Sequence, residues 1–276
     1  MKSTYQFLLS RIILLLSPAI VFSAYSLSAE NSLRFVINAP GSSPYIYFDN
    51  EESRYRGVVV DFFESFDKSN AFNVQYVDSS RARNEKLVFT KVADLFFGSS
   101  VWVDNPQRFI YSDTIMPHVS FIYAAQKFEN PFSLETHNRA LICTRHDFTY
   151  PYLQPYFNEH KLVRVDSSSQ TTMANMLSKG RCDFAIMSKE NARAVMFDKE
   201  FCANEFYQSP MPVTIDELSF IMGKNLTEAR DKINQQIAVF ISSGDRDKSI
   251  QKHIRPHTFP KRVCEKTADT GLPTED

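Results

Sequence analysis

Residues 161–188 read KLVRVDSSSQTTMANMLSKGRCDFAIMS and change hydrophobic period twice. KLVRVD at the start and CDFAIMS at the end are short apolar runs, which are typical of buried β-strands. Between them, Met173, Met176 and Leu177 recur at helical spacing. Serines precede this helical segment as candidate N-caps, and Gly180 follows it as a stop signal. The stretch therefore predicts a strand, a helix and a second strand, the unit from which parallel sheets are built.

The same alternation runs through most of the remaining chain in two blocks. The first block contains predicted strands at 33–39, 74–78 and 93–98, with predicted helices within 57–66 and 83–89. The second block adds a strand at 140–144 before the quoted stretch. Because strands that alternate with helices indicate parallel sheets, two such blocks predict an α/β protein with two lobes.

Two further segments connect or extend these blocks. Residues 120–135 form an apolar strand that leads into a polar, proline-containing stretch, as expected of a hinge. A strand at 217–223 precedes a helix that we expect to start at Asn225, with Glu228 as its capping-box partner. A short helix at 247–254 follows. These elements have no sheet of their own, so we expect them to dock on an existing lobe.

The N-terminal segment has the pattern of a secretory signal peptide. Lys2 and Arg11 are its charges before Glu30, and the mostly apolar run 12–22 is about half the roughly 20 residues that a membrane-spanning helix needs. Small residues between Ser23 and Ala29 fit a cleavage site. We expect residues 1–29 to be removed from an exported soluble protein, and a membrane anchor is the alternative.

Composition narrows the functional classes. The chain carries 31 basic and 32 acidic residues without a basic stripe, so it gives no support for a nucleic-acid or membrane-surface partner. Its 24 phenylalanines and 12 tyrosines are enough for a core and for an aromatic-lined pocket. No C-x-x-C or H-x-x-x-H spacing occurs, so we expect neither a metal nor another cofactor.

The four cysteines all follow the signal segment, and we expect them to form disulfides in an oxidising compartment. Three connectivities of Cys143, Cys182, Cys202 and Cys264 are possible. Cys264 lies in the mostly polar tail, 256–276, which we do not expect to pack by itself, so a bridge that ties this tail down is the natural expectation.

The succession of segments resembles a known family. The matching pieces are SPYIYFDN (43–50), RGVVVDFFESF (56–66), RARNEKLVFTKVADLFFG (81–98), RFIYSDTIMPHVSFIYAA (108–125), RALICTRHDFTYPYL (139–153), the segment 167–188 and ELSFIMGKN (217–225). In this order they resemble the type II periplasmic solute-binding proteins, specifically solute-binding protein family 3, which includes the polar amino acid binders.

The resemblance implies a periplasmic binding protein-like II fold. Each lobe would be a mostly parallel sheet flanked by helices, and two strands would form the hinge. Lobe 1 would comprise 33–122 plus 213–255, and lobe 2 would comprise 123–212. The ligand would bind in the cleft of a monomeric periplasmic protein and close it, for delivery to an inner-membrane ABC permease or a sensor.

The chain departs from the family at both groups that hold an amino acid. In the amino acid binders, an arginine six residues before the aromatic of an aromatic-Ser motif clamps the α-carboxylate, and counting back from Tyr111 gives Asn105. The acidic residue that holds the ligand's ammonium is replaced by Ser188. Arg108 and Arg145 are the candidate replacements for the anion clamp, because a guanidinium fits a carboxylate or phosphate. A solvated surface position is the alternative for Arg108 and for Arg83.

Most candidate ligand-binding residues lie in the loops at the carboxyl ends of the predicted strands, where ligands bind to open parallel sheets. Arg83 is added because the resemblance implies an arginine near the cleft rim at this position, and Arg108 is added as the candidate replacement for the clamp. The candidates are Tyr45, Tyr47, Arg83, Ser99, Trp102, Arg108, Arg145, Tyr150, Ser169 and Ser188.

We interpret the chain as a non-enzymatic protein that captures a small polar or anionic, amino acid-like solute for ABC import or sensing. An accessory module with a degenerate pocket is one alternative. The other is a dehydratase-like enzyme on the same fold, for which Glu190 and His146 are the nearby candidates, although no motif connects them. We therefore assign no catalytic residue.

Overall fold

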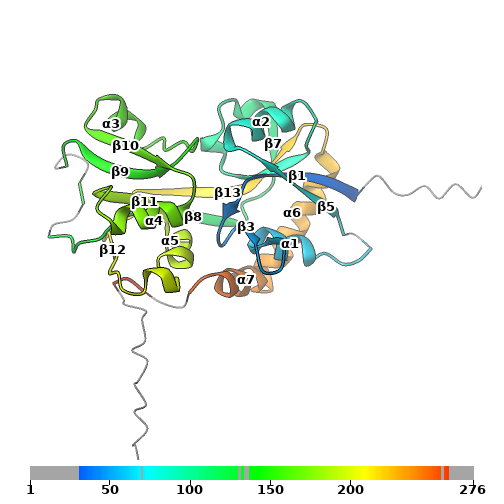
Figure 1. Ribbon diagram of the computed structural model, residues 1–276. Helices are drawn as coiled ribbons and strands as arrows, with labels where there is room; N and C mark the ends of the chain where they lie inside the picture. The colour runs from blue at the N-terminus through cyan, green and yellow to red at the C-terminus, as the bar shows by residue number, and fades with distance from the viewer. Residues whose placement is uncertain (1–30, 70, 130–131, 134–136, 256–257, 261–276) are drawn as a thin grey trace, which may run out of the picture. The chain divides into compact units, whose positions relative to one another are not determined.

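The computed structural model describes residues 31–69, 71–129, 132–133, 137–255 and 258–260 (Figure 1). The predicted signal peptide and most of the predicted tail lie outside these ranges. Within the described residues, no helix has both the length and the apolar character required to cross a bilayer.

A single ten-stranded sheet runs through both lobes in the order β10-β9-β11-β8-β13-β6-β1-β5. The strands along this path are β10 (Leu162–Ser167), β9 (Ala140–Arg145), β11 (Phe184–Ser188), β8 (Met116–Ala124), β13 (Thr214–Gly223), β6 (Leu95–Gly98), β1 (Ser32–Asn38) and β5 (Asn73–Ser79). Two short strands lie off the path: β12 (Tyr207–Gln208) pairs with β8, and β7 (Phe109–Tyr111) pairs with β13. We call the part around β5, β1 and β6 lobe 1, and the part around β10, β9 and β11 lobe 2.

The long antiparallel strands β8 and β13 belong to both lobes (Figure 1). Residues 116–120 of β8 pair with 214–218 of β13, while 120–123 of β8 pair with β11 in lobe 2. Residues 219–222 of β13 pair with β6 in lobe 1. The predicted two-strand hinge therefore corresponds to these strands, and the lobe limits at 122 and 213 remain a prediction.

Lobe 1 is built on an aromatic core. Its helices are α1 (Val58–Glu64), α2 (Arg81–Phe89), α6 (Thr227–Ser242) and α7 (Asp245–His253), with single 3-10 turns η2 (Ser100–Trp102) and η3 (Pro106–Arg108) and a small sheet of β2 (Gly41–Ser42), β3 (Ile46–Asp49) and β4 (Arg54–Arg56). The apolar face expected for α1 is buried, and Phe62 packs 5.1 Å from Phe220 of β13 and 5.5 Å from Phe240 of α6. Aromatic burial of this kind fastens the C-terminal helices to the first sheet.

Lobe 2 contains the strand–helix–strand unit predicted from residues 161–188. β10 is followed by α4 (Gln170–Ser178) and then by β11, and the side chain of Ser169 accepts a hydrogen bond from the Thr172 backbone N–H at 3.0 Å. Gly180 has φ +66° after α4, a left-handed conformation that favours glycine. The remaining helices of lobe 2 are α3 (Gln154–Asn158), α5 (Lys189–Val195) and the turn η4 (Lys199–Phe201).

The expected capping box of α6 is wrong. The helix begins at Thr227 after Leu226, and no side chain caps it. The reason is a tight turn in which the Leu226 N–H donates to the Gly223 carbonyl. The Asn225 side chain folds back over Gly223, 3.0 Å from where a Cβ would stand, and so faces away from the helix start.

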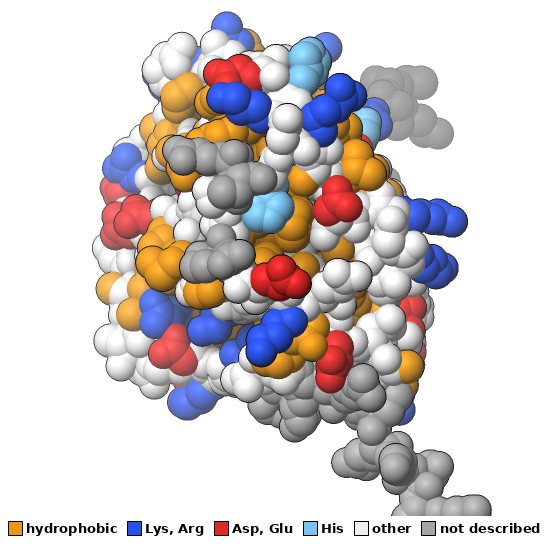
Figure 2. All heavy atoms as spheres, turned by 90° about the vertical axis from the view of Figure 1, so that its left-hand side faces the viewer, with side chains coloured by type: hydrophobic (Ala, Val, Ile, Leu, Met, Phe, Trp, Pro, Cys, Tyr) orange, Lys and Arg blue, Asp and Glu red, His pale blue; other side chains and the backbone are white. Residues whose placement is uncertain are grey.

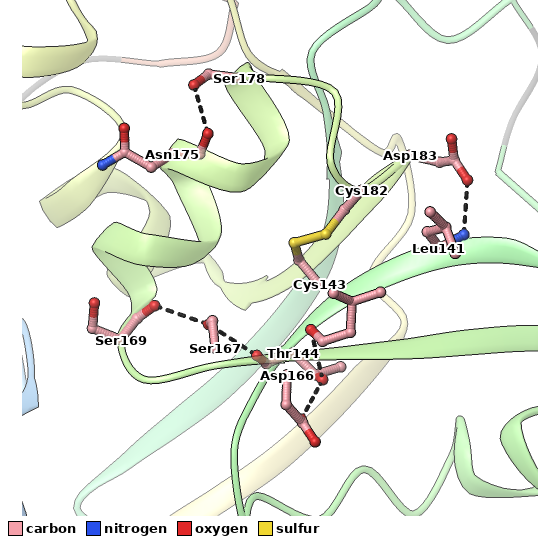
Figure 3. Close-up of a disulfide and its surroundings, with 11 residues drawn as sticks. Leu141, Cys143, Thr144, Asp166, Ser167, Ser169, Asn175, Ser178, Cys182 and Asp183 are labelled. Carbon is pink, nitrogen blue, oxygen red and sulfur yellow. Dashed lines mark hydrogen bonds between the residues drawn. A yellow bond between two sulfur atoms is a disulfide. The ribbon is translucent and has the colours of Figure 1, made fainter.

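The structure contains one disulfide for which both cysteines lie in the described residues. Cys143 of β9 is bonded to Cys182, which precedes β11 (Figure 3). Next to it, the Leu141 backbone N–H donates to Asp183 at 2.7 Å, so the same two segments are joined twice. Cys202 is not a free thiol, and Cys264 lies outside the described residues.

Asp61 of α1 holds α7 against lobe 1. Its carboxylate accepts hydrogen bonds from Ser249 at 2.6 Å, Lys252 at 2.9 Å and His253 at 2.9 Å. Burial alone would raise the pKa of Asp61, but the hydrogen bonds from His253, Ser249 and Lys252 outweigh it and hold the pKa below its usual range. The far side of the His253 ring lies 3.1 Å from the Tyr47 hydroxyl.

The segment after α7 contacts lobe 2. The Arg193 guanidinium on α5 donates to the Arg255 carbonyl at 3.1 Å, and the Phe259 ring lies 4.5 Å from Phe197 and 5.1 Å from Tyr123. The two lobes are thus connected here as well as through β8 and β13.

Replacing Cys143 and Cys182 together by alanine should lower the free energy of unfolding by about 3–4 kcal/mol, because the bridge closes a loop with a sequence separation of 39 residues. Urea unfolding of the wild type and the double variant under oxidising conditions measures the difference. A difference below about 1 kcal/mol would contradict a stabilising role for the bridge.

Asp61→Asn should destabilise the protein by about 1–3 kcal/mol at neutral pH, because it removes the negative charge and one of the two acceptor oxygens that serve the buried Ser249 and His253 and the exposed Lys252. A carboxylate with a depressed folded-state pKa contributes stability above its unfolded pKa of about 3.9 and loses it as pH falls. The variant should therefore lose less stability than the wild type between about pH 5 and pH 2. Asp247→Asn on the exposed side of α7 is the control and should change neither value.

Candidate functional site

A cavity with a volume of about 140 Å³ lies between the two lobes. Lobe 1 contributes residues from β1, β6 and α2, lobe 2 contributes residues from the β9–α3 connection and from α4, and the crossing strands contribute His118, Ser120, Thr214, Asp216 and Leu218. The hinge strands therefore form one wall of the cavity. The site is located where strand ends from both lobes face each other, as the sequence predicted.

The lining is mostly aromatic and aliphatic. Its aromatic side chains are Phe35, Tyr45, Phe96, Phe97, Trp102, Phe148, Tyr150 and Tyr152. Trp102 is packed edge-on against His118, with ring centroids 4.9 Å apart. Such walls favour a solute with an apolar body, and a few polar groups must then fix its orientation.

Hydrogen bonds cross directly from lobe 1 to lobe 2 beside the cavity. The Ser42 hydroxyl accepts from the Gln170 amide at 2.8 Å and from the Asn191 amide at 3.0 Å. The Asn191 amide also donates to the Ser43 carbonyl. The Tyr45 hydroxyl lies 2.9 Å from the Ser188 hydroxyl. These four contacts hold the lobes together, so the structure is a closed state.

Tyr45 is the centre of a network of hydrogen bonds beside the cavity. Its hydroxyl lies 3.1 Å from His118 Nδ1 and donates to Glu190 at 3.5 Å. Burial raises the pKa of Tyr45 well above its usual value and lowers the pKa of His118 to about 4, so both are neutral at pH 7. Burial also raises the pKa of Glu190. The contacts of Tyr45 with Ser188 and Glu190 join lobe 1 to lobe 2.

Arg145 is a buried cation in the cavity wall. Its side chain is at the end of β9, the residue is 3% exposed, and its guanidinium lies 5.1 Å from the Phe148 ring. It donates to the neutral Gln170 amide oxygen at 2.7 Å, while its Nε has no partner. Burial lowers the pKa of Arg145, but an arginine keeps its proton. A guanidinium in this position is poised to receive an anion.

Arg81, rather than Arg83, reaches the cavity. Arg81 lines the cavity, and its Nη1 forms an ion pair with Glu85 at 3.1 Å that neutralises its charge. Its Nη2 donates to the Trp102 carbonyl at 2.6 Å. Arg83 is exposed and contacts the Ser80 hydroxyl at 3.3 Å. Side chains two residues apart on an α-helix point in directions that differ by about 200° around the helix axis. Arg81 faces the cavity, so Arg83 points to the outer side of α2.

Arg108 also lies outside the cavity. It is exposed at the end of η3, and its guanidinium covers the Phe89 ring at 4.6 Å. With Asp104 and Asn105 it lines a separate outer groove. Asn105, which stands at the position of the clamping arginine of the amino acid binders, and Arg108, its candidate replacement, are thus both outside the cavity lining.

The candidate residues divide into those that line the cavity and those that do not. The structure brings six of them together in the cavity lining: Tyr45, Ser99, Trp102, Arg145, Tyr150 and Ser188. It leaves four outside that lining: Tyr47, Arg83, Arg108 and Ser169. Tyr47 contacts His253 and Ser169 caps α4, so both have structural contacts instead.

Sequence reasoning did not select several polar residues of the lining, namely Ser42, Asn84, His118, Gln170, Asn191 and Asp216. Asn84 is 4% exposed on α2, and its Oδ1 has no hydrogen-bond partner. Asp216 is half-buried on β13, where burial raises its pKa and the Thr214 hydroxyl donates to it at 3.2 Å. Asn84 could have been found from the sequence only with the correct helical phase of α2.

The exterior differs from the cavity in its charge pattern. Figure 2 views the molecule from the lobe 2 end and shows lysines and arginines interspersed with acidic side chains over this face. Exposed charges of this kind are solvated, whereas the charge of Arg145 inside is not.

Comparisons with known proteins identify the fold. No family model and no curated protein matches the sequence. Among solved structures, a mutant of ArgBP from T. maritima superimposes with a TM-score of 0.65 at 18% identity, covering 81% of this chain and 95% of that one. The GluR0 ligand-binding core in complex with L-glutamate gives a TM-score of 0.67 at 11% identity, covering 81% and 98%. AncCDT-1, described as an ancestral amino acid-binding protein and a precursor of cyclohexadienyl dehydratase, gives 0.64 at 16% identity, covering 82% and 96%.

At these identities the likeness establishes the fold. The chain has the two-lobed α/β fold of substrate-binding proteins, and the predicted fold class is confirmed.

Tyr45→Phe should shift the ligand-free protein toward an open form, because it removes the hydroxyl that contacts Ser188 of lobe 2. One buried hydrogen bond contributes about 0.5–1.5 kcal/mol, which corresponds to roughly a 2- to 12-fold change in the open-to-closed ratio. Small-angle X-ray scattering should show a larger radius of gyration. Tyr55→Phe is the matched control, since the Tyr55 hydroxyl donates to Asp78 within lobe 1. We call the cross-lobe hydrogen bonds at Ser42, Ser43 and Tyr45 the latch. An equal radius of gyration in the Tyr45 and Tyr55 variants would contradict a role for Tyr45 in this latch.

Proposed function

We propose that this chain is a non-enzymatic solute-binding protein that captures a small solute between its lobes. The observation that carries the proposal is the cavity between the lobes, whose wall includes residues of the hinge strands themselves. A solute that contacts both lobes stabilises the closed state by its higher affinity for that state. Bending of β8 and β13 would open the cavity for entry and release.

The fold neighbours support a small polar solute as the ligand. AbpA from Streptococcus pneumoniae, which is described as an amino acid ABC transporter substrate-binding protein, is bound to L-arginine, and the GluR0 core is bound to L-glutamate. We propose for this chain a solute of comparable size, delivered to an inner-membrane ABC permease or to a sensor. Residues 1–29 would act as a cleaved signal peptide, and the mature protein would act as a periplasmic monomer. The lobes would comprise 33–122 plus 213–255 and 123–212.

The contacts of the two catalytic candidates argue against the enzyme alternative. His146 has a 68% exposed side chain beside Asp147 and does not line the cavity. Glu190 contacts Tyr45 in the latch. The two candidates therefore share no proton path to a bound solute, which general acid–base catalysis requires.

Thermal unfolding against a solute panel tests the proposal. The panel should contain amino acids, small carboxylates, amines and short peptides. A solute at about 100 times its Kd adds roughly 2.7 kcal/mol of stability, which raises Tm by several degrees for a chain of this size. Any solute that raises Tm should also decrease the radius of gyration of the Tyr45→Phe variant, because binding restores closure.

Arg108→Ala is the control, because its guanidinium lies outside the cavity, and it should bind the same solute with unchanged affinity. Binding without any change in radius would contradict capture by closure. A flat panel on folded protein would favour the accessory module.

A further inference from the structure

Four buried side-chain atoms in the described part of the chain have no hydrogen-bond partner: Asn31 Oδ1, Asn84 Oδ1, Arg145 Nε and Arg193 Nε. Buried polar atoms are nearly always paired, so each exception calls for an explanation. Asn84 and Arg145 both line the cavity between the lobes, whereas Asn31 and Arg193 do not. One of the two is an acceptor on lobe 1, and the other is a donor on lobe 2.

The charge of Arg145 defines the first requirement on the solute. None of the described ion pairs includes Arg145, and its one side-chain hydrogen bond is to a neutral amide. Arg81 also lines the cavity, but Glu85 already neutralises it. Asp216 is half-buried on the hinge and is not within ion-pair distance of Arg145. The uncompensated positive charge in the wall is therefore that of Arg145, and a carboxylate fits its fork of donors.

Asn84 defines the second requirement. It is 4% exposed, and its Oδ1 faces no protein donor. A buried amide oxygen of this kind is satisfied by a hydroxyl or N–H group of the solute. Because Asn84 belongs to α2 of lobe 1 and Arg145 to β9 of lobe 2, one solute that satisfies both would bridge the lobes.

The size and lining of the cavity define the third requirement. One water-sized group occupies about 10–15 Å³ of such a volume, so about 140 Å³ accommodates on the order of ten non-hydrogen atoms. The aromatic and aliphatic side chains around this space offer no further unpaired charge besides those named above. The body of the solute is therefore apolar.

We infer that the solute is a small carboxylate of about ten non-hydrogen atoms with an apolar body and a separate hydrogen-bond donor. Its carboxylate binds Arg145, and its donor binds Asn84 Oδ1. This inference rests on the proposed solute-binding function and specifies the chemical class of the solute.

Isothermal titration calorimetry with matched probes tests the inference. The probes are 3- and 4-hydroxyphenylacetate, phenylacetate, which lacks the donor, and the two hydroxyphenylacetamides, which lack the charge. For the wild type, we expect the better hydroxyphenylacetate to bind at least tenfold more tightly than phenylacetate and at least tenfold more tightly than its own amide.

Two variants assign each preference to one residue. Arg145→Met should abolish the preference for acid over amide and keep the preference for hydroxyl over hydrogen. Asn84→Leu should do the opposite. Arg108→Ala, whose arginine lies outside the cavity, should keep both preferences. If Arg145→Met does not fold, Arg145→Lys replaces it: it keeps the charge but loses the fork, so acid binding should weaken at least fivefold and amide binding should not change.

The contrary outcomes separate the inference from the proposed function. An acid-over-amide preference that stays unchanged in Arg145→Met, or in Arg145→Lys where that variant replaces it, would overturn the inference, as would tighter binding of the amides by the wild type. Closure driven only by a neutral or cationic solute of the wider panel would also overturn it, and the proposed function would stand. Absence of binding by every carboxylate at millimolar concentration overturns the inference, and absence of closure with every solute overturns the proposed function.

Discussion

The antiparallel pairing of β8 with β13 is the interaction on which both the fold and the site depend. Residues 116–120 and 214–218 form the ladder that passes from one lobe to the other, and the flanking parts of the same strands pair with the strands of each lobe in the ten-stranded sheet. A bend in this ladder changes the angle between the lobes without breaking the strand pairing inside either lobe. Because His118, Thr214 and Asp216 project from this ladder into the cavity wall, the hinge and the binding site are one unit. Any solute that packs on this wall acts directly on the element that bends.

The segment after α7 adds a third connection between the lobes. Asp61 fastens α7 to lobe 1, while Arg255 and Phe259 contact Arg193, Phe197 and Tyr123 of lobe 2. Two strands alone leave a hinge free to twist as well as to bend. A further contact beside α5 opposes twisting, so the lobes can approach along a narrower set of paths. Cross-lobe contacts such as the one between Tyr45 and Ser188 depend on this alignment.

The sequence predicted the strands and helices, which depend on local hydrophobic periodicity. It missed which side chains face the cavity, because that depends on the orientation of each helix and on contacts between distant residues. The alternation of periods in 161–188 gave β10, α4 and β11, and the Ser169 cap formed as expected. Arg83 was selected from the family resemblance, whereas Arg81 and Asn84 of the same helix line the cavity. Arg108 was expected to turn back toward the cleft, but Pro106 starts a separate 3-10 turn, and the Phe89 ring offers the guanidinium a surface partner. Arg145 was selected for its place after a strand, and that reasoning holds because strand ends face the cavity in both lobes.

The closed state contains a balance that makes a switch possible. Five cross-lobe hydrogen bonds at Ser42, Ser43 and Tyr45 favour closure, each by about 0.5–1.5 kcal/mol. In the same structure Asn84 Oδ1 and Arg145 Nε are buried without partners, and each unsatisfied atom costs about 1–3 kcal/mol. These opposing amounts are similar in size. A solute that satisfies both atoms removes the cost while the latch remains, and the population then moves to the closed form. Under the proposed function, the two atoms that would orient the solute would also set how strongly it drives closure, which would couple recognition of the solute to the change in shape that a permease or sensor would detect.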